Sequence, residues 1–329
     1  AEALTGALHA MAQQGNTPFG VYVTSPDYLG GVQELPALAA VCRAQGVPLL
    51  VDNAHGAYLR FLPQNCHPIA QGAAMCCDSA HKTLPVVTGG AYLHLAHDAP
   101  VQDEAAVRGA LALFGSTSPS YLILQSLDAC NAVLAGDYPR RLVQCCAALE
   151  GLRRSLNKTA AARQCPVPLA VAGAQQEPMK LTLDAAALGC TGTALADALR
   201  RAQMECEYAD PRYVVLMFTP ENPPQDYTRL QTVLEQLLAA VPAGLLRPEN
   251  RAGEFAALQQ QAVQRCTIRQ AVLGAQVRIP VHKALGRVCA MPTVSCPPAI
   301  PVAVSGEEIT PAAIALMQRY GIEELSVLR

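Results

Sequence analysis

Two short apolar runs, each followed at once by a polar turn, constrain the fold of this chain most strongly. Residues 47–51 (VPLLV) run directly into Asp52, and residues 73–77 (AAMCC) run into DSAHKTLP, which contains Lys82. Apolar runs of this length are typical of buried parallel strands. In open α/β sheets, ligands bind in the crevice outside the carboxyl ends of the strands. The pattern therefore predicts that Asp52 and Lys82 reach one crevice from neighbouring strands.

The remaining patterns of the first half alternate between short strands and amphipathic helices. Leu4, Leu8 and Met11 share one face of a helix predicted over residues 1–14. This alternation is typical of half of a parallel sheet with helical crossovers. The other elements predicted here are strands over 20–24 and 90–95 and a helix over 32–45.

After residue 115 the pattern changes to long helices and then to a compact α+β unit. A long helix is predicted over 116–156, with a break near Pro139. Thr310, Pro311 and Gly321 mark a final helix, because hydroxyls cap helices, proline suits the first turn and glycine follows the end. Between these helices the sequence predicts strands over 180–183, 205–209 and 213–218, helices over 193–204, 226–241 and 254–264, and a Pro-rich stretch over 296–301.

The composition of the chain indicates which kinds of binding partner it can have. The chain is 51% hydrophobic, which supports a large core, and only 15% charged, which predicts that much of its surface is buried in an oligomer. The net charge is −2 without a Lys/Arg cluster, which argues against nucleic acid and anionic membranes as partners. No apolar run reaches the roughly 18 residues expected of a membrane span.

The cysteines indicate the cellular compartment of the chain, and the first residues indicate whether it is a fragment or a processed chain. The 13 cysteines are irregularly spaced and include no CxxC, so we expect free thiols in a reducing cytoplasm. The chain begins AEALTGALHA, without Met, a basic leader or a signal-type core. This beginning predicts a fragment or a processed chain.

An acid and a lysine in one crevice are the pair that pyridoxal phosphate (PLP) needs. The lysine bonds the cofactor covalently, and the acid keeps the ring nitrogen protonated. Ser79 and His81 share the motif of Lys82, and together with Asp52 they favour a cofactor site over an ordinary surface lysine. The residues alone leave open which bond of a substrate would be broken.

Five stretches, in this order along the chain, resemble the Orn/Lys/Arg decarboxylase family of fold-type-I PLP-dependent enzymes. The resemblance implies an α/β large domain with a partial parallel or mixed sheet, a small α+β C-terminal domain, and assembly as a homodimer or larger homo-oligomer. The implied boundaries are 1–115 for the remainder of the large domain, 116–156 for a connecting helix, 157–245 for the small domain and 246–329 for a C-terminal segment. The stretches are SPDYLGG, PLLVDNAHGA, DSAHKTLPVVTGG, STSPSYLILQSLDA and CPPAIPVAVSGEEIT.

The resemblance also implies roles for the residues of the crevice. Lys82 would bond the cofactor and later move protons at the α-carbon of the substrate. Asp52 would pair with the ring nitrogen, and Ala54 would lie against one face of the ring. His55 would reach the ring oxygen or the substrate, so His55 and Lys82 are the predicted catalytic residues.

The resemblance also implies that hydroxyls and a second histidine bind the phosphate of the cofactor. Ser79 and His81 would hydrogen-bond it, as the SxHK motif of the family does. Ser116 and Thr117 resemble a hydroxyl pair that reaches the phosphate of the neighbouring subunit's cofactor. One position departs from the family, which has an acid where this chain has Asn53.

The resemblance implies decarboxylation of a basic amino acid, arginine, lysine or ornithine, and a role in polyamine metabolism. The family's phosphate loop and stacking aromatic lie upstream of the matched region, so impaired activity is expected of this chain. Two alternatives stay open. One is another fold-type-I activity, an aminotransferase or an α-oxoamine synthase. The other is a non-catalytic truncated paralogue that acts as a partner subunit.

The histidines outside the crevice do not predict a metal site. His94 and His97 are three residues apart, and residues with this spacing on a strand would face opposite sides of it. Cys66 and His67 read as a loop pair. The expectation is therefore that no metal is bound.

Overall fold

The computed structural model describes residues 1–242, 258, 260–291 and 301–329. They form two compact units, each assembled from separate stretches of the chain. The first unit consists of Ala1–Thr159, Ala170–Leu183 and Val215–Ala239, and the second of Ala160–Leu169, Asp184–Val214 and Ala240–Arg329. The domain boundaries given above stay a prediction.

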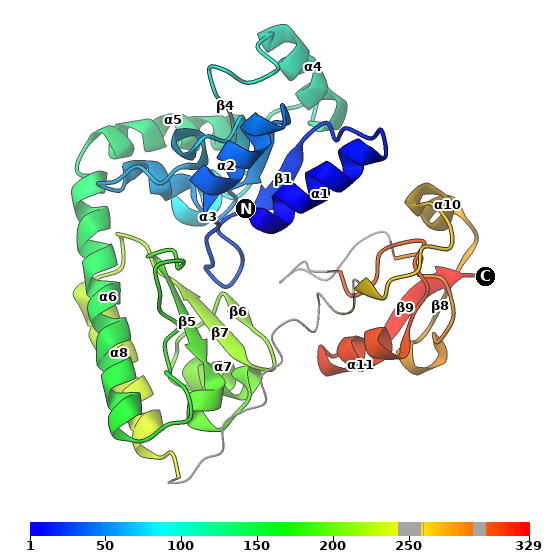
Figure 1. Ribbon diagram of the computed structural model, residues 1–329. Coiled ribbons are helices and arrows are strands. Elements are labelled where there is room, and N and C mark those ends of the chain that lie inside the picture. The colour runs from blue at the N-terminus through cyan, green and yellow to red at the C-terminus, as the bar shows by residue number, and fades with distance from the viewer. Residues whose placement is uncertain (243–257, 259, 292–300) are drawn as a thin grey trace. The chain divides into compact units, whose positions relative to one another are not determined.

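The first unit contains a sheet with the strand order β1-β2-β3-β4 (Figure 1). Strands β1, β2 and β3 are parallel, and β4 is antiparallel to β3. In the register, Asp52 of β2 lies opposite Cys77 of β3, so the carboxyl ends of these two strands are neighbours, as the sequence predicted. The bounds are Val21–Thr24 for β1, Leu49–Asp52 for β2, Met75–Asp78 for β3 and Tyr92–Leu95 for β4.

Burial on one face of this sheet explains the apolar runs. Leu49 and Val51 of β2 and Cys76 of β3 pack with Leu35 and Ala39 of helix α2 in one core cluster. Alternate residues of β2 point to the other face, which places the Asp52 side chain away from this core. The helices and 3-10 turns of this part are α1 (Glu2–Gln13), α2 (Leu35–Ala44), η1 (Ala57–Phe61), η2 (Pro68–Gln71), α3 (Ala80–Thr83) and α4 (Glu104–Phe114).

The core side chain Leu49 gives a test of this packing. Leu49 is 2% exposed, so we expect Leu49→Ala to lower the free energy of unfolding by about 2–5 kcal/mol, through lost burial and the cavity left behind. Leu113→Ala on α4 is the matched control, since Leu113 is 78% exposed. Denaturant titration followed by circular dichroism measures both. Equal losses in the two variants would contradict the packing.

The long helix predicted after residue 115 is two helices. Helix α5 spans Tyr121–Ala135 and helix α6 spans Tyr138–Ala162. The break falls at residues 136–137, slightly before the predicted Pro139, which lies in the first turn of α6, where proline costs no hydrogen bond. Helix α4 was not predicted. None of its residues is buried against the described part of the chain, so it lacks a core-facing stripe.

A second sheet has the strand order β5-β7-β6. Helices α6 and α8 lie side by side (Figure 1), and Gln231 Nε2 of α8 donates to Ser155 Oγ of α6 at 3.0 Å. The elements agree with the predicted strands and helices, except that the strand over 205–209 is reduced to two residues. The bounds are Lys180–Asp184 for β5, Ala185–Leu188 for η3, Gly192–Arg201 for α7, Tyr208–Ala209 for β6, Tyr213–Met217 for β7 and Pro224–Ala239 for α8.

The C-terminal part contains an antiparallel pair, β8 (Gln276–Pro280) and β9 (Glu324–Leu328), which was not predicted. The final helix was predicted, and it is α11, which spans Pro311–Arg319. The Thr310 hydroxyl at its start accepts from Ala313 N. Of the helix predicted over 254–264, residues 254–257 and 259 lie outside the described residues, and residues 261–264 are not helical, so the prediction is wrong there. The Pro-rich stretch over 296–301 lies outside the described residues except for residue 301. The remaining elements are α10 (Ile268–Leu273) and η4 (Val281–Lys283).

Two further features bear on the sequence-based expectations. All cysteines of the described residues are free thiols. Within the described ranges, no helix combines the length and apolar character that crossing a membrane requires.

Candidate active site

Lys82 and His55 meet at the carboxyl edge of the first sheet. Strand β3 ends at Asp78, Ser79 is the N-cap residue of the short helix α3, and Lys82 lies within that helix. His55 lies three residues beyond the end of β2. The Lys82 Nζ is 3.3 Å from His55 Nε2. The parallel pairing of β2 and β3 therefore joins two motifs that are far apart in the sequence.

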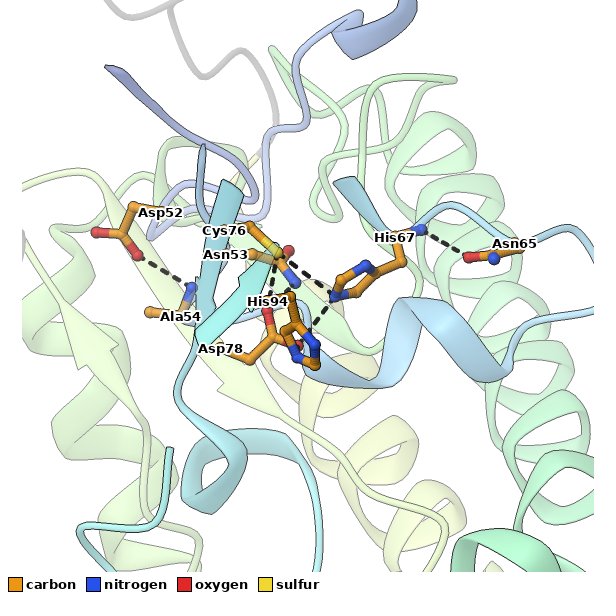
Figure 2. A network of polar contacts seen from close by, with 8 residues as sticks. All are labelled: Asp52, Asn53, Ala54, Asn65, His67, Cys76, Asp78 and His94. Atoms are coloured by element: carbon orange, nitrogen blue, oxygen red, sulfur yellow. Dashed lines mark hydrogen bonds and ion pairs between the residues drawn. The ribbon is translucent and has the colours of Figure 1, made fainter. Parts of the chain in front are cut away.

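Asp52, the last residue of β2, is held by two donors at this edge. Its Oδ1 accepts from the Ala54 backbone N–H at 3.0 Å, a contact that Figure 2 shows. Its Oδ2 accepts from the Tyr22 hydroxyl at 3.2 Å. Partial burial and then the Asp52 carboxylate raise the pKa of Tyr22 to about 12, so this phenol keeps its proton and stays a donor. The carboxylate thus has a fixed orientation before any ligand arrives.

His55 is buried and neutral. It is 4% exposed, and the ring of Tyr28 meets it edge-on at a centroid distance of 5.0 Å. Burial, and then the positive charges of Lys180 and Lys82, lower the pKa of His55 to about 3. Its Nδ1 has no hydrogen-bond partner among the described residues. Since the Lys82 ammonium donates to Nε2, Nδ1 carries the ring proton and is a buried donor without an acceptor.

The lowered pKa of His55 predicts a pH dependence of stability. Between pH 6.5 and pH 3 the unfolded chain binds a proton that the folded chain does not, so the free energy of unfolding falls as the pH falls. We expect this contribution to reach about 1 kcal/mol per pH unit. His55→Gln removes this pH-dependent contribution. His97→Gln is the control, because it replaces an exposed imidazole. Denaturant titrations at pH 5 and pH 7 that show the same wild-type-to-H55Q difference would contradict the prediction.

Ser79 and His81, the residues predicted to hold a phosphate, lie just before Lys82 in the sequence. The Ser79 hydroxyl does not cap α3, which leaves it available to a ligand. His81 Nδ1 donates to the Gly90 carbonyl at 2.9 Å. This bond fixes the ring, and His81 can donate from Nε2 to a phosphate only as an imidazolium.

Ser116 and Thr117 lie apart from the Lys82–His55 pair in sequence and in environment. Both are exposed in the connection between α4 and α5. The Ser116 Oγ accepts from Ser118 N at 3.1 Å, a local turn. That their hydroxyls reach the phosphate of a neighbouring subunit's cofactor stays a prediction.

Two residues of this region were missed in the sequence analysis. Lys180 is 3% exposed, and its Nζ donates to the carbonyls of Asp27 at 2.8 Å and Tyr28 at 3.2 Å. It holds the turn that carries Tyr28 against His55, and its charge helps to keep His55 neutral. Glu177, fully buried, accepts from the Tyr58 hydroxyl and from Met179 N. No local motif marks Lys180, because its partners lie about 150 residues earlier.

A second polar network, which the sequence analysis also missed, is centred on Asp78 (Figure 2). The buried Asp78 carboxylate accepts from Asn53 Nδ2 at 2.7 Å and contacts His67 Nε2 at 3.0 Å and His94 Nε2 at 3.1 Å. Burial alone would raise the pKa of Asp78, but the hydrogen bonds from His67, His94 and Asn53 outweigh it and hold the pKa well below its usual range. An ionised acid at position 53 could not donate this bond, so Asn53 supplies a donor that an acid there would lack.

Solved structures share this fold. The structure of the constitutive lysine decarboxylase of E. coli covers 95% of this chain and 58% of its own chain, with a TM-score of 0.67 and 18% identity. The fold is that of the lysine decarboxylases of E. coli and Francisella novicida, with the mixed α/β sheet that the sequence predicted. The chain belongs to the Orn/Lys/Arg decarboxylase family, whose major domain matches residues 1–175. The resemblance drawn from the sequence is thereby confirmed.

Curated relatives cover most of this chain as well. YaaO, an uncharacterized protein of Bacillus subtilis, is 28% identical over 308 residues, which are 91% of this chain and 61% of YaaO. An arginine decarboxylase of Bacillus subtilis is 27% identical over 299 residues, 88% of this chain and 59% of the relative. The chain thus spans about three fifths of the length of these relatives.

Proposed function

We propose that this chain acts as a PLP-dependent decarboxylase of a basic amino acid, arginine, lysine or ornithine, in a cytoplasmic homodimer or larger homo-oligomer. The observation that carries the proposal is the 3.3 Å contact between Lys82 Nζ and His55 Nε2, at the same edge of the sheet as the anchored Asp52 carboxylate. A lysine amine, an acid and a buried imidazole are thereby gathered at the carboxyl edge of two parallel strands, where ligands of such sheets bind. Family membership supports the reaction type.

The residues present fit PLP. The buried His55 Nδ1 donor lacks an acceptor among the described residues, and an unpaired buried donor costs about 1–3 kcal/mol that a bound oxygen would recover. Lys82 would hold the cofactor covalently, Asp52 would hold the ring nitrogen, and Ser79 with His81 would hold the phosphate. When bound, PLP supplies a protonated ring that accepts the electron pair left at the α-carbon as carbon dioxide departs.

The charges of the site divide the work between Lys82 and His55. Because the pKa of His55 is about 3, His55 stays neutral at physiological pH and does not take the proton of the neighbouring Lys82 ammonium. Its Nε2 therefore acts as an acceptor that orients the amine. Proton delivery to the α-carbon falls to Lys82, in the role of a general acid.

Product analysis tests the proposal against the other fold-type-I activities. The purified chain is incubated with PLP and with arginine, lysine and ornithine carrying a labelled carboxyl group. We expect labelled carbon dioxide and the matching amine from one of the three. A keto acid without carbon dioxide would overturn the proposal in favour of an aminotransferase. No turnover and no cofactor absorbance, together with co-purification of a full-length decarboxylase, would overturn it in favour of a partner subunit.

A further inference from the structure

We propose that His67, Asp78 and His94 bind a divalent transition-metal ion at a site distinct from the Lys82 centre. One ligand atom from each residue lies within 4.8 Å of the other two. The contacts to the Asp78 Oδ2 are 3.0 Å from His67 Nε2 and 3.1 Å from His94 Nε2. Imidazole nitrogens and a carboxylate oxygen are the ligands that Zn²⁺ and its neighbours in the first row prefer.

The spacing of the three atoms suits a metal with small adjustments. Zn²⁺ binds nitrogen and oxygen ligands at about 2.0–2.2 Å, so two ligands of a tetrahedral site lie roughly 3.3 Å apart. The two contacts on Asp78 are only slightly shorter than this separation. The rings of His67 and His94 are nearly perpendicular, at 82°, with centroids 5.0 Å apart, so they approach the carboxylate from different directions.

Three separate segments deliver these ligands and hold them in place. Asp78 ends β3, His94 lies on the antiparallel strand β4, and His67 precedes the turn η2. Asn53 Nδ2 donates a hydrogen bond to the other carboxylate oxygen of Asp78, Oδ1, at 2.7 Å. This leaves Oδ2 to the imidazoles. Hydrogen bonds of this kind orient ligands in metal sites. Figure 2 shows the side chains of His67, His94 and Asn53 converging on Asp78.

The surroundings leave room for a further ligand. A cavity of about 430 Å³ is lined by His67, Asp78 and His94 together with Asn65 and Arg60. Water or a small anion in this cavity can complete the coordination, as in sites with three protein ligands. The Cys76 Sγ, 3.7 Å from His67 Nε2, adds a soft donor beside the three.

A hydrogen-bond network without metal is the competing interpretation. In that case each imidazole carries its proton on Nε2 and donates to the Asp78 carboxylate, which satisfies all three groups. The two interpretations differ in one observable: a metal site binds one ion per chain and loses it when either histidine is replaced. A hydrogen-bond network binds none.

Calorimetric titration of the whole chain, free of purification tags and bound metal, with Zn²⁺ tests the proposal, and Co²⁺ provides visible absorption bands. We expect one ion per chain. His94→Gln and His67→Gln should each weaken binding by more than the roughly 10–100-fold that loss of an outer-shell partner costs. His97→Gln is the matched control, because His97 is an exposed histidine three residues from His94, and it should bind as the wild type does.

The unfolding temperature gives a readout independent of heat signals. Zn²⁺ should raise it in the wild type and in H97Q, because a preformed site binds the ion more tightly in the folded chain than in the unfolded one, and should leave it unchanged in H94Q. His94 has a side chain 38% exposed, so H94Q does not leave a buried cavity, and circular dichroism would verify its fold. Absence of stoichiometric binding, or equal binding by H67Q, H94Q and H97Q, would overturn the proposal. Neither readout depends on decarboxylase activity.

Discussion

Lys82→Arg is expected to lower the proposed decarboxylase turnover by at least about 10³-fold, because one replacement would remove both the amine proposed to bond the cofactor and the group proposed to move protons. Arginine keeps the positive charge next to His55 Nε2, so the fold and the neutral state of His55 should persist. The measurement is release of labelled carbon dioxide at saturating PLP.

Lys158→Arg is the matched control for this variant. Lys158 is an exposed lysine on α6, so K158R should retain wild-type turnover and cofactor absorbance. Turnover of K82R within about tenfold of the wild type would contradict the assignment of Lys82 as both anchor and proton donor.

Asp52→Asn is the second change with a large expected effect. The amide has nearly the shape of the carboxylate and can still accept from Ala54 N, but it cannot hold a proton on the ring nitrogen through a charge. We expect turnover to fall about 10²–10⁴-fold, with cofactor binding also weakened. Asp128→Asn, at an exposed position of α5, should leave both unchanged. Turnover and the PLP dissociation constant separate the two effects, and unaltered turnover in D52N would count against the ring-nitrogen role.

The strands of the first sheet could be predicted from the sequence because their signal is local. Leu49 and Val51 face the core cluster, and the polar residue that follows the run marks the end of the strand. Parallel pairing of β2 with β3 then brings the turn residues together without further information. The Lys82–His55 contact lies between these two turns, but the sequence did not predict that particular contact.

The rest of the site depends on pairings that no local pattern reveals. The Asp78 network joins a loop histidine, a strand-end acid and a histidine on an antiparallel strand. His97 is exposed and lies beyond the end of β4, and sequence spacing could not show that His94 and His67 face the same carboxylate. Lys180 reaches the site from a strand about 150 residues away. The antiparallel pair β8 and β9 was missed for the same reason, because its two strands are separated by more than 40 residues.

The central claim, that one cofactor ring lies between Lys82 and Asp52, is tested most directly by locating the lysine that bonds it. The whole chain is incubated with PLP, treated with borohydride to fix any cofactor bonded to an amine, digested, and analysed by peptide mass spectrometry. We expect a pyridoxyl group on Lys82 in the wild type, at reduced occupancy in D52N. A modification absent from Lys82, or found on Lys180 instead, would contradict it.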